Sequence, residues 1–231
     1  MFESIENKKI SQVVIEQIQD MIMSGELKNG DKLPPERELT QTLNIGRPAL
    51  REALKALEVI GLIESRHGQG NFIVNNTENS FFKPLSLSFK LSNGNIEDIL
   101  ELRHLLENYT VSQAAIHASE EDIQRLYELY ESLVNSETLE LKSHYDKEFH
   151  YEIAKISKNT LINNLLESTS YLFDNFISKT IGMTFSSEDS IDSLYEEHLN
   201  IIRAIEKHDP DKASKCIFLH LNKINRGMLI Q

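Results

Sequence analysis

Between Ile96 and Ile230 the chain contains almost no residue that interrupts a helix. Only Pro210, Gly182 and Gly227 break the run. Apolar residues recur there every three or four positions, which places them on one face of a helix, and no alternating strand pattern occurs. The spacing predicts helices over residues 96–118, 120–136, 139–157, 161–181, 191–207 and 210–229. We therefore expect the C-terminal part to be an antiparallel helical bundle.

The N-terminal part contains three shorter helical segments. Apolar spacing predicts helices over residues 9–23, 36–43 and 47–60. The second follows Pro34-Pro35, and the third opens with a proline in its first turn, where the missing N–H is harmless. Asn44-Ile45-Gly46 lies between the second and third segments. These residues predict two helices joined by a tight turn.

After residue 61 the apolar period changes from that of a helix to that of a strand. Residues 62–63 and 72–74 are apolar and flank a glycine-rich turn at 66–70. Two helices with a short turn, followed by a β-hairpin, form a winged helix-turn-helix. The predicted fold is mainly α: a winged helix-turn-helix in residues 1–76, a linker with one short helix in 77–95, and an all-α antiparallel helical-bundle sensor domain in 96–231.

The net charge of −12 is unevenly distributed along the chain. Residues 1–76 hold 9 Lys and Arg against 11 Asp and Glu, whereas residues 77–231 hold 15 against 25. Phosphate binding needs a local basic face and not a basic protein. The charge therefore neither excludes nor supports a role in DNA binding. The basic residues in or beside the turn and hairpin are Arg37, Arg47, Arg51, Lys55 and Arg66.

The sequence also predicts a cytoplasmic location without a membrane anchor. No apolar run approaches the roughly 18 residues of a membrane-spanning helix. The opening MFESIENKKISQ lacks the apolar core of a signal peptide. The single cysteine, Cys216, cannot form an internal disulfide, which suits a reducing compartment.

The stretch LPPERELTQTLNIGRPALREALKALEVIGLIESRHGQGNFIV, residues 33–74, resembles the DNA-binding domain of the GntR family of regulators. It matches the family's order of L-P-x-E-R-x-L, R-x-x-[VL]-R-E-A-L-x-x-L, G-L-I and the wing G-x-G-x-F. The resemblance implies contacts to double-stranded DNA from Arg37, Arg47, Arg51, His67 and Gly68.

The chemistry of the third segment suits base recognition. Arg47 and Arg51 lie four residues apart, on one face of the recognition helix and near the end that enters the major groove. An arginine there can bind both acceptors of guanine, which is worth ~1–3 kcal/mol of discrimination. The chain departs from the family at Gly46, where a serine is usual. Glycine is only a slightly weaker helix cap, so we expect the fold to survive and the change to bear on one phosphate contact.

A helical domain of this size behind such a motif resembles the FadR-type branch of the family, whose C-terminal domain is called FCD. The matching stretches are Glu101-Leu102-Arg103 with Glu107, Asp146-x-x-Phe149-His150, Glu197-His198, and His220. The resemblance implies that Asp146, His150, His198 and His220 coordinate a metal in the sensor cavity and leave positions open for an effector or water.

The ligand types favour a particular class of metal. Asp146 and His150 are four residues apart, so both project from one helix face. One carboxylate and three imidazoles suit a borderline divalent ion such as zinc, nickel, copper or manganese, and not calcium. We expect zinc or nickel. The other histidines match no ligand position and are interpreted as ordinary helix residues: His104, His117, His144 and His208.

Arg103 is the candidate residue for effector binding. A buried arginine must be paired, and its planar fork suits a carboxylate. A cavity holding a metal and Arg103 would receive a small carboxylic acid, with one oxygen on the metal. The alternative is an internal ion pair with Glu107, one turn further along the helix. Residues alone leave the two interpretations open.

The predicted function is a transcription regulator, most simply a repressor, that acts as a homodimer on a palindromic operator. One alternative keeps the DNA-binding role but has a metal-free sensor of acyl-CoA type. Another is a metal-dependent hydrolase, because Asp/His sites with open positions can activate water. No added general base accompanies the site, and a DNA-binding unit would be idle in such an enzyme. We therefore expect no enzymatic activity.

Overall fold

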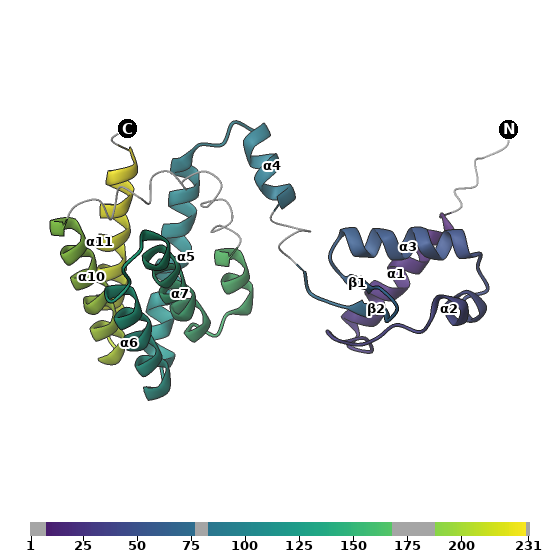
Figure 1. Ribbon diagram of the computed structural model, residues 1–231, viewed down its shortest axis with the longest axis horizontal. Helices are drawn as coiled ribbons and strands as arrows, with labels where there is room; N and C mark the ends of the chain where they lie inside the picture. The colour runs from purple at the N-terminus through teal and green to yellow at the C-terminus, as the bar shows by residue number, and fades with distance from the viewer. Residues whose placement is uncertain (1–7, 77–82, 168–187, 230–231) are drawn as a thin grey trace. The chain divides into compact units, whose positions relative to one another are not determined.

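The computed structural model describes residues 8–76, 83–167 and 188–229 (Figure 1). The chain divides into two compact units, Met1–Ser88 and Phe89–Gln231. None of the helices in the described ranges combines the length and apolar character that crossing a bilayer requires.

The first unit consists of three helices and a two-stranded hairpin. The elements are α1 (Ile10–Met23), α2 (Glu36–Thr42), α3 (Arg47–Val59), β1 (Ile63–Arg66) and β2 (Gly70–Ile73). Asn44 adopts a left-handed backbone with φ of 51° and reverses the chain between α2 and α3. Gly46 is the N-cap of α3, and Pro48 lies in its first turn. This is the predicted winged helix-turn-helix, with the hairpin as the wing.

The hairpin carries a third paired segment that the sequence analysis missed. Within the hairpin, Ile63 pairs with Ile73. The N–H of Ile73 also donates to the carbonyl of Asp31 at 2.8 Å, and that of Leu33 donates to the carbonyl of Asn71 at 2.9 Å. The segment around Leu33 is too short to show strand alternation, so no pattern could reveal it.

The core of the first unit fixes which face of α3 is available to a partner. One face of α3 is buried against α1, α2 and the hairpin, so the opposite face is left to solvent. The buried apolar residues are Val14, Ile18, Leu33, Leu50, Ala53, Leu54, Leu57, Ile63 and Ile73. Arg47 and Arg51 are exposed on α3.

The second unit consists of helices and their connecting turns in its described ranges. Helix α4 spans the boundary between the two units, which falls at Ser88 and Phe89. Residues 160–167 are also helical, while the rest of the helix predicted over 161–181 lies outside the described residues. The short α4 lies within residues 77–95, where the sequence predicts a linker with one short helix. The helices are α4 (Lys83–Leu91), α5 (Ile96–His117), α6 (Glu120–Val134), α7 (Leu139–Ile156), α10 (Glu188–Glu206) and α11 (Pro210–Leu229).

Side-chain caps determine where the long helices begin. The Asp98 N–H donates to Asn95 Oδ1 at 2.9 Å, and the Asn95 N–H donates to Asp98 Oδ2 at 3.0 Å, which forms a capping box at the start of α5. Ser119 and Asp122 form the same motif at α6. Such caps satisfy backbone N–H groups that have no partner inside the helix.

The bundle packs α5 against α7 and α11, α6 against α7, and α10 against α11 (Figure 1). Their shared core includes Phe149, Ile201, Ile205 and Ile217, each at most 1% exposed. The rings of His150 and His198 lie edge-on to Phe149, at centroid distances of 5.6 and 4.8 Å. The apolar core therefore holds the imidazoles in place on separate helices.

We expect Leu57→Ala to destabilise the first unit by about 2–5 kcal/mol, because Leu57 is fully buried on α3 and its truncation leaves a cavity. Val59→Ala is the matched control on the same helix, since Val59 is 66% exposed and should change stability by about 0.5 kcal/mol or less. Native-state amide hydrogen exchange of residues 10–73 measures both. Equal protection in the two variants would contradict this account of the core.

Candidate functional site

The second unit brings together four predicted ligands from three helices. Asp146 and His150 come from α7, His198 from α10 and His220 from α11. One ligand atom from each residue lies within 4.8 Å of all the others. The three histidines are buried, with exposed fractions of 4% or less. This buried carboxylate and imidazole cluster could bind a metal ion.

Each histidine of the cluster is oriented by an acceptor at its Nδ1 atom. These contacts join His150 Nδ1 to Glu107 Oε2 at 2.7 Å, His198 Nδ1 to the Leu194 carbonyl at 2.8 Å, and His220 Nδ1 to Glu197 Oε2 at 3.1 Å. Ionised carboxylates and carbonyl oxygens can only accept hydrogen bonds. In each neutral imidazole the hydrogen therefore belongs on Nδ1.

That assignment leaves a lone pair on each Nε2 atom, and these atoms converge. The Nε2 atoms of His150 and His220 are 3.3 Å apart, and His198 Nε2 is 3.0 Å from Asp146 Oδ1. Neutral imidazoles then place acceptors against one another without a hydrogen between them. A bound cation removes this repulsion, and carboxylates behind ligating imidazoles are the usual supports of such a site. The residues fit a divalent metal.

The electrostatics of the cluster keep its carboxylates ionised. Burial acts to raise the pKa of Glu107, but the charge of Arg103, together with that of His150 when His150 is protonated, outweighs burial and lowers this pKa to about 2. Burial also opposes ionisation of Asp146, yet a doubly protonated His198, which donates to Asp146 from Nε2, holds the pKa of that carboxyl well below the usual range. Burial lowers the pKa of His220 to about 4. At neutral pH His220 is therefore uncharged and its lone pair is available to a metal.

Arg103 forms an internal ion pair with Glu107, which is one of the two interpretations that the sequence left open. Its Nε–H donates to Glu107 Oε1, and the exposed fractions of the two side chains are 17% and 3%. The other oxygen of Glu107 contacts His150. Glu107 therefore joins the arginine to the carboxylate and imidazole cluster through a single carboxylate.

The sequence analysis did not foresee how Glu107 and Glu197 act in the cluster. Glu107 was expected only as a partner of Arg103, one turn away. Glu197 was noted beside His198, but it contacts His220, 23 residues further on. No sequence spacing reveals these contacts, because they depend on how α5, α10 and α11 pack.

The first unit exposes all five residues expected to contact DNA: Arg37 on α2, Arg47 and Arg51 on α3, and His67 and Gly68 in the turn between β1 and β2. Gly68 has a positive φ of 71°, which favours glycine at the tip of the wing. Arg51 Nε lies 3.0 Å from Glu36 Oε2, and the arginine side chain is 70% exposed. This pair is accessible to solvent and to a partner.

The position of Gly46 can accept the serine that is usual in the family. A Cβ atom there would lie 3.6 Å from Pro48 Cδ, an ordinary van der Waals distance, and the backbone is extended. No side chain caps α3 in this chain. Compared with serine, glycine at this position lacks a hydroxyl that could cap α3. The surrounding structure leaves room for a side chain, so no steric constraint requires glycine here.

Comparison with known proteins covers both units. The family model described as "Bacterial regulatory proteins, gntR family" matches residues 10–73, and the FCD domain model matches residues 98–223. The transcriptional regulator LutR of Bacillus subtilis (strain 168) is 32% identical over 206 residues, 88% of this chain and 94% of LutR. The transcriptional repressor NanR of Escherichia coli (strain K12) is 32% identical over 225 residues, 94% of this chain and 84% of NanR.

A solved structure also resembles the chain along most of its length. The Streptococcus agalactiae GntR structure has a TM-score of 0.74 at 28% identity and covers 94% of this chain and 99% of its own. Fold, relatives and matched domains together define a DNA-binding transcription regulator and not an enzyme. The chain belongs to the GntR family, in the FadR-type branch that carries a C-terminal FCD domain.

We expect Glu107→Gln to weaken binding of zinc by about 10–100-fold, because the amide has one acceptor oxygen instead of two and no charge, so it cannot accept from both His150 and Arg103. Competition with a chromophoric chelator measures this affinity. Glu101→Gln, at an exposed position of α5, is the control.

Because Glu107 is buried, the apo variants are first compared by thermal unfolding. Glu197→Gln is a second test, because it replaces the carboxylate that contacts His220. The Glu197 side chain is 21% exposed, so this change should disturb the fold less than Glu107→Gln. Unchanged zinc affinity in both variants, with folded protein, would contradict the role given to these carboxylates.

Proposed function

We propose that this regulator is a metal-dependent repressor that acts as a cytoplasmic homodimer on a palindromic operator. A small carboxylate bound at or near a divalent metal in the helical unit controls its affinity for DNA. The observation that carries this proposal is the convergence of three Nε2 lone pairs and the Asp146 carboxylate on one buried point.

The metal ligands in this proposal are Asp146, His150, His198 and His220. Three imidazoles and one carboxylate favour zinc or nickel. When bound, the metal supplies a positive charge and open coordination positions for an effector oxygen. The protein contributes orientation, since Glu107, Glu197 and the Leu194 carbonyl hold the three rings.

Arg103 is proposed to contact a second oxygen of the effector. A guanidinium has five N–H donors, so it can bind Glu107 and a second carboxylate together. Arg103 is partly accessible, at 17% exposed, whereas Glu107 is buried. An acid bound to Arg103 would weaken its hold on Glu107, which also orients His150. The effector and the metal would thereby influence the same carboxylate.

The proposed DNA contacts come from Arg37, Arg47, Arg51, His67 and Gly68. Arg47 and Arg51 would enter the major groove, and the wing tip would lie in the adjacent minor groove. Arg51 must leave Glu36 to do so. An exposed ion pair is worth only about 0–1 kcal/mol, less than the ~1–3 kcal/mol of a guanine contact. Exchange of Glu36 for DNA is therefore favourable.

The regulatory step requires two arrangements of the dimer that bind the operator unequally. An effector can shift the balance between them only by its difference in affinity for the two. NanR is named as a repressor, which supports repression as the outcome here. In this proposal, one of the two arrangements places the two winged units on adjacent half-sites of the operator. The acid bound at the metal either favours or disfavours that arrangement.

Arg47→Ala and Arg51→Ala should each lower affinity for the specific operator by about 10–100-fold, because each removes one bidentate base contact. Fluorescence anisotropy at fixed salt measures this, with duplexes taken from the region upstream of the regulator's own gene. Lys28→Ala, at an exposed lysine outside α2, α3 and the hairpin, is the control. Wild-type affinity in both arginine variants would refute the DNA-contact assignment.

His150→Ala and His220→Ala should abolish stoichiometric divalent metal in protein purified without chelators, because each removes one of four ligands. Elemental analysis measures the content. His144→Ala is the control, since His144 is an exposed histidine on the same helix as His150. Wild-type protein that holds no metal, and gains none when zinc or nickel is added, would favour the metal-free acyl-CoA type of sensor.

A further inference from the structure

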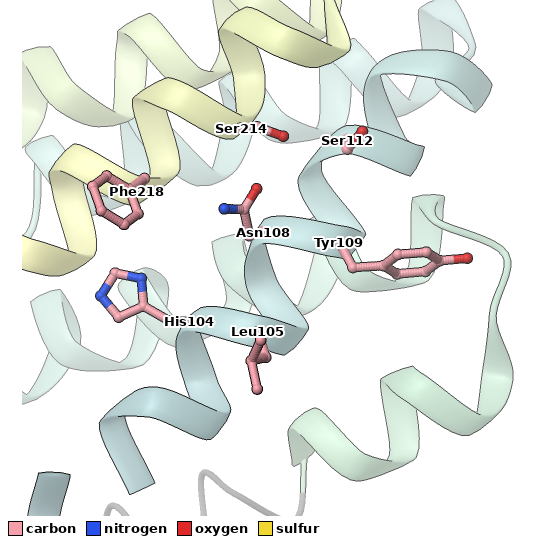
Figure 2. Close-up of a pocket in the computed structure, with 7 residues that line it drawn as sticks. All are labelled: His104, Leu105, Asn108, Tyr109, Ser112, Ser214 and Phe218. Carbon is pink, nitrogen blue, oxygen red and sulfur yellow. The ribbon is translucent and has the colours of Figure 1, made fainter. Parts of the chain in front are cut away.

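Two surface features of the described residues lie outside the sites above. One is a groove of about 500 Å³ between α5 and α11, where His104 and Phe218 face each other (Figure 2). No charged side chain lines this groove, and nothing in the structure shows what covers it. The other feature is charged and belongs to the wing. It is a pair of cations, Lys32 and Arg66, on the ring of Phe72.

The register of the wing places both cations on its outer face. Successive residues of a strand point to opposite faces of a sheet. Ile73 is buried in the core, so its neighbour Phe72 points to the other face. Lys32 pairs with Phe72 from the segment before α2, and Arg66 pairs with Gly70, two residues before Phe72. The two cations therefore share the face of Phe72.

The Phe72 ring contacts both cations, but only one of them has an acidic partner. Lys32 Nζ lies 5.8 Å from the ring centroid and Arg66 Cζ lies 4.5 Å from it, which is the range of a cation–π contact. A guanidinium nitrogen of Arg66 also lies 2.7 Å from Glu64 Oε2. No carboxylate of the described residues forms an ion pair with Lys32. The charge of this exposed lysine is therefore available to an anionic partner.

Lys32 lies close to the tip of the wing. A Cβ atom at Gly70 would lie 3.3 Å from Lys32 Cε, so the missing side chain lets the lysine stem cross β2 at that position. Gly70 is two residues from Gly68 at the tip, or about 7 Å along a strand. The minor groove is only about 6 Å wide, and phosphates border it. A wing tip in this groove would bring Lys32 to the phosphates at its edge.

We propose that Lys32 binds a phosphate of the DNA backbone at the edge of the minor groove that receives the wing tip. The inference rests on the proposed function, which places His67 and Gly68 in that groove, and it adds a contact from outside the helix-turn-helix and the hairpin. The ring of Phe72 restricts the lysine stem before DNA arrives, so less side-chain freedom is lost on binding. Arg66 adds positive charge beside it. Such a contact fixes the position of the protein on the duplex and reads no sequence.

The dependence of DNA affinity on salt tests this contact. Each phosphate that a protein neutralises adds about 0.9 to the slope of log affinity against log salt. In a dimer, Lys32→Met should therefore reduce this slope by about 2 and lower affinity roughly 10-fold per copy at about 0.1 M salt. The loss should be equal on the operator and on a scrambled duplex of the same length, because a phosphate contact carries no sequence information. Fluorescence anisotropy measures both duplexes.

Two further variants serve as controls. Methionine keeps the unbranched stem on Phe72, so the fold should be retained, and Lys32→Arg restores the charge and should restore the slope. Lys28→Met removes the same charge from an exposed lysine four residues earlier and should leave the slope unchanged. The proposal is overturned by an unchanged slope in Lys32→Met, by a slope that Lys32→Arg does not restore, by an equal loss in Lys28→Met, or by a loss confined to the operator.

Uncharged phosphate analogues locate the contact on the duplex. A methylphosphonate is placed in turn at each phosphate along the minor groove of the operator. At one position in each half-site, wild-type protein should lose roughly 10-fold in affinity, and Lys32→Met should lose nothing further. If every position affects the two proteins equally, Lys32 touches no phosphate and the proposal fails.

The same measurements separate this proposal from the proposed function. If Arg47→Ala lowers operator affinity while Lys32→Met matches wild type on both duplexes, the wing contact is wrong and the proposed function stands. If wild-type protein does not prefer the operator to the scrambled duplex, the proposed function fails. The salt slope on the scrambled duplex then still tests the contact from Lys32.

Discussion

The orientation of three buried imidazoles is the constraint on which the interpretation of the helical unit depends. Each ring has an acceptor from the protein at its Nδ1 atom. The Nε2 atoms of His150 and His220 face each other, and that of His198 faces Asp146. Three Nε2 lone pairs without a donor are costly to bury in an apolar core, because an unpartnered polar group loses its hydration. Here Phe149 and its neighbours fix the rings in place. The bundle therefore positions a buried carboxylate and imidazole cluster that could bind a metal ion.

Glu107 connects this cluster to Arg103 on α5. One oxygen binds Arg103 and the other binds His150. A buried ion pair contributes little net stability by itself, because desolvation of its charges offsets their attraction. Its importance here is geometric. The Glu107 carboxylate contacts both Arg103, which would bind the acid in the proposed function, and His150, which would bind the metal.

The DNA-binding unit shows how a markedly acidic protein can still bind nucleic acid. The core on one side of α3 fixes its opposite side as the exposed face, and Arg47 and Arg51 lie there. The contact between Arg51 and Glu36 is weak because it is exposed. In the proposed complex a phosphate or guanine would replace this carboxylate, so the local arrangement would matter more than the net charge of −12.

Much of the fold and part of the candidate site were predictable because the signals are local. Glycine and proline positions, apolar periods and caps such as Asn95 act within a few residues, and they determined where the helices and the hairpin begin. The spacing of Asp146 and His150 also placed two ligands on one helix face. The segment around Leu33 escaped prediction because its partner, β2, lies some 40 residues away along the chain.

Tertiary structure alone decided which groups meet. It set Glu107 against His150, set Glu197 against His220 instead of its neighbour in sequence, and left Tyr109 exposed on α5. Helix period fixes which side of a helix a residue occupies, but not which other helix that side faces. Contacts between helices depend on the packing of the whole core, and that information is spread over residues far apart in the chain.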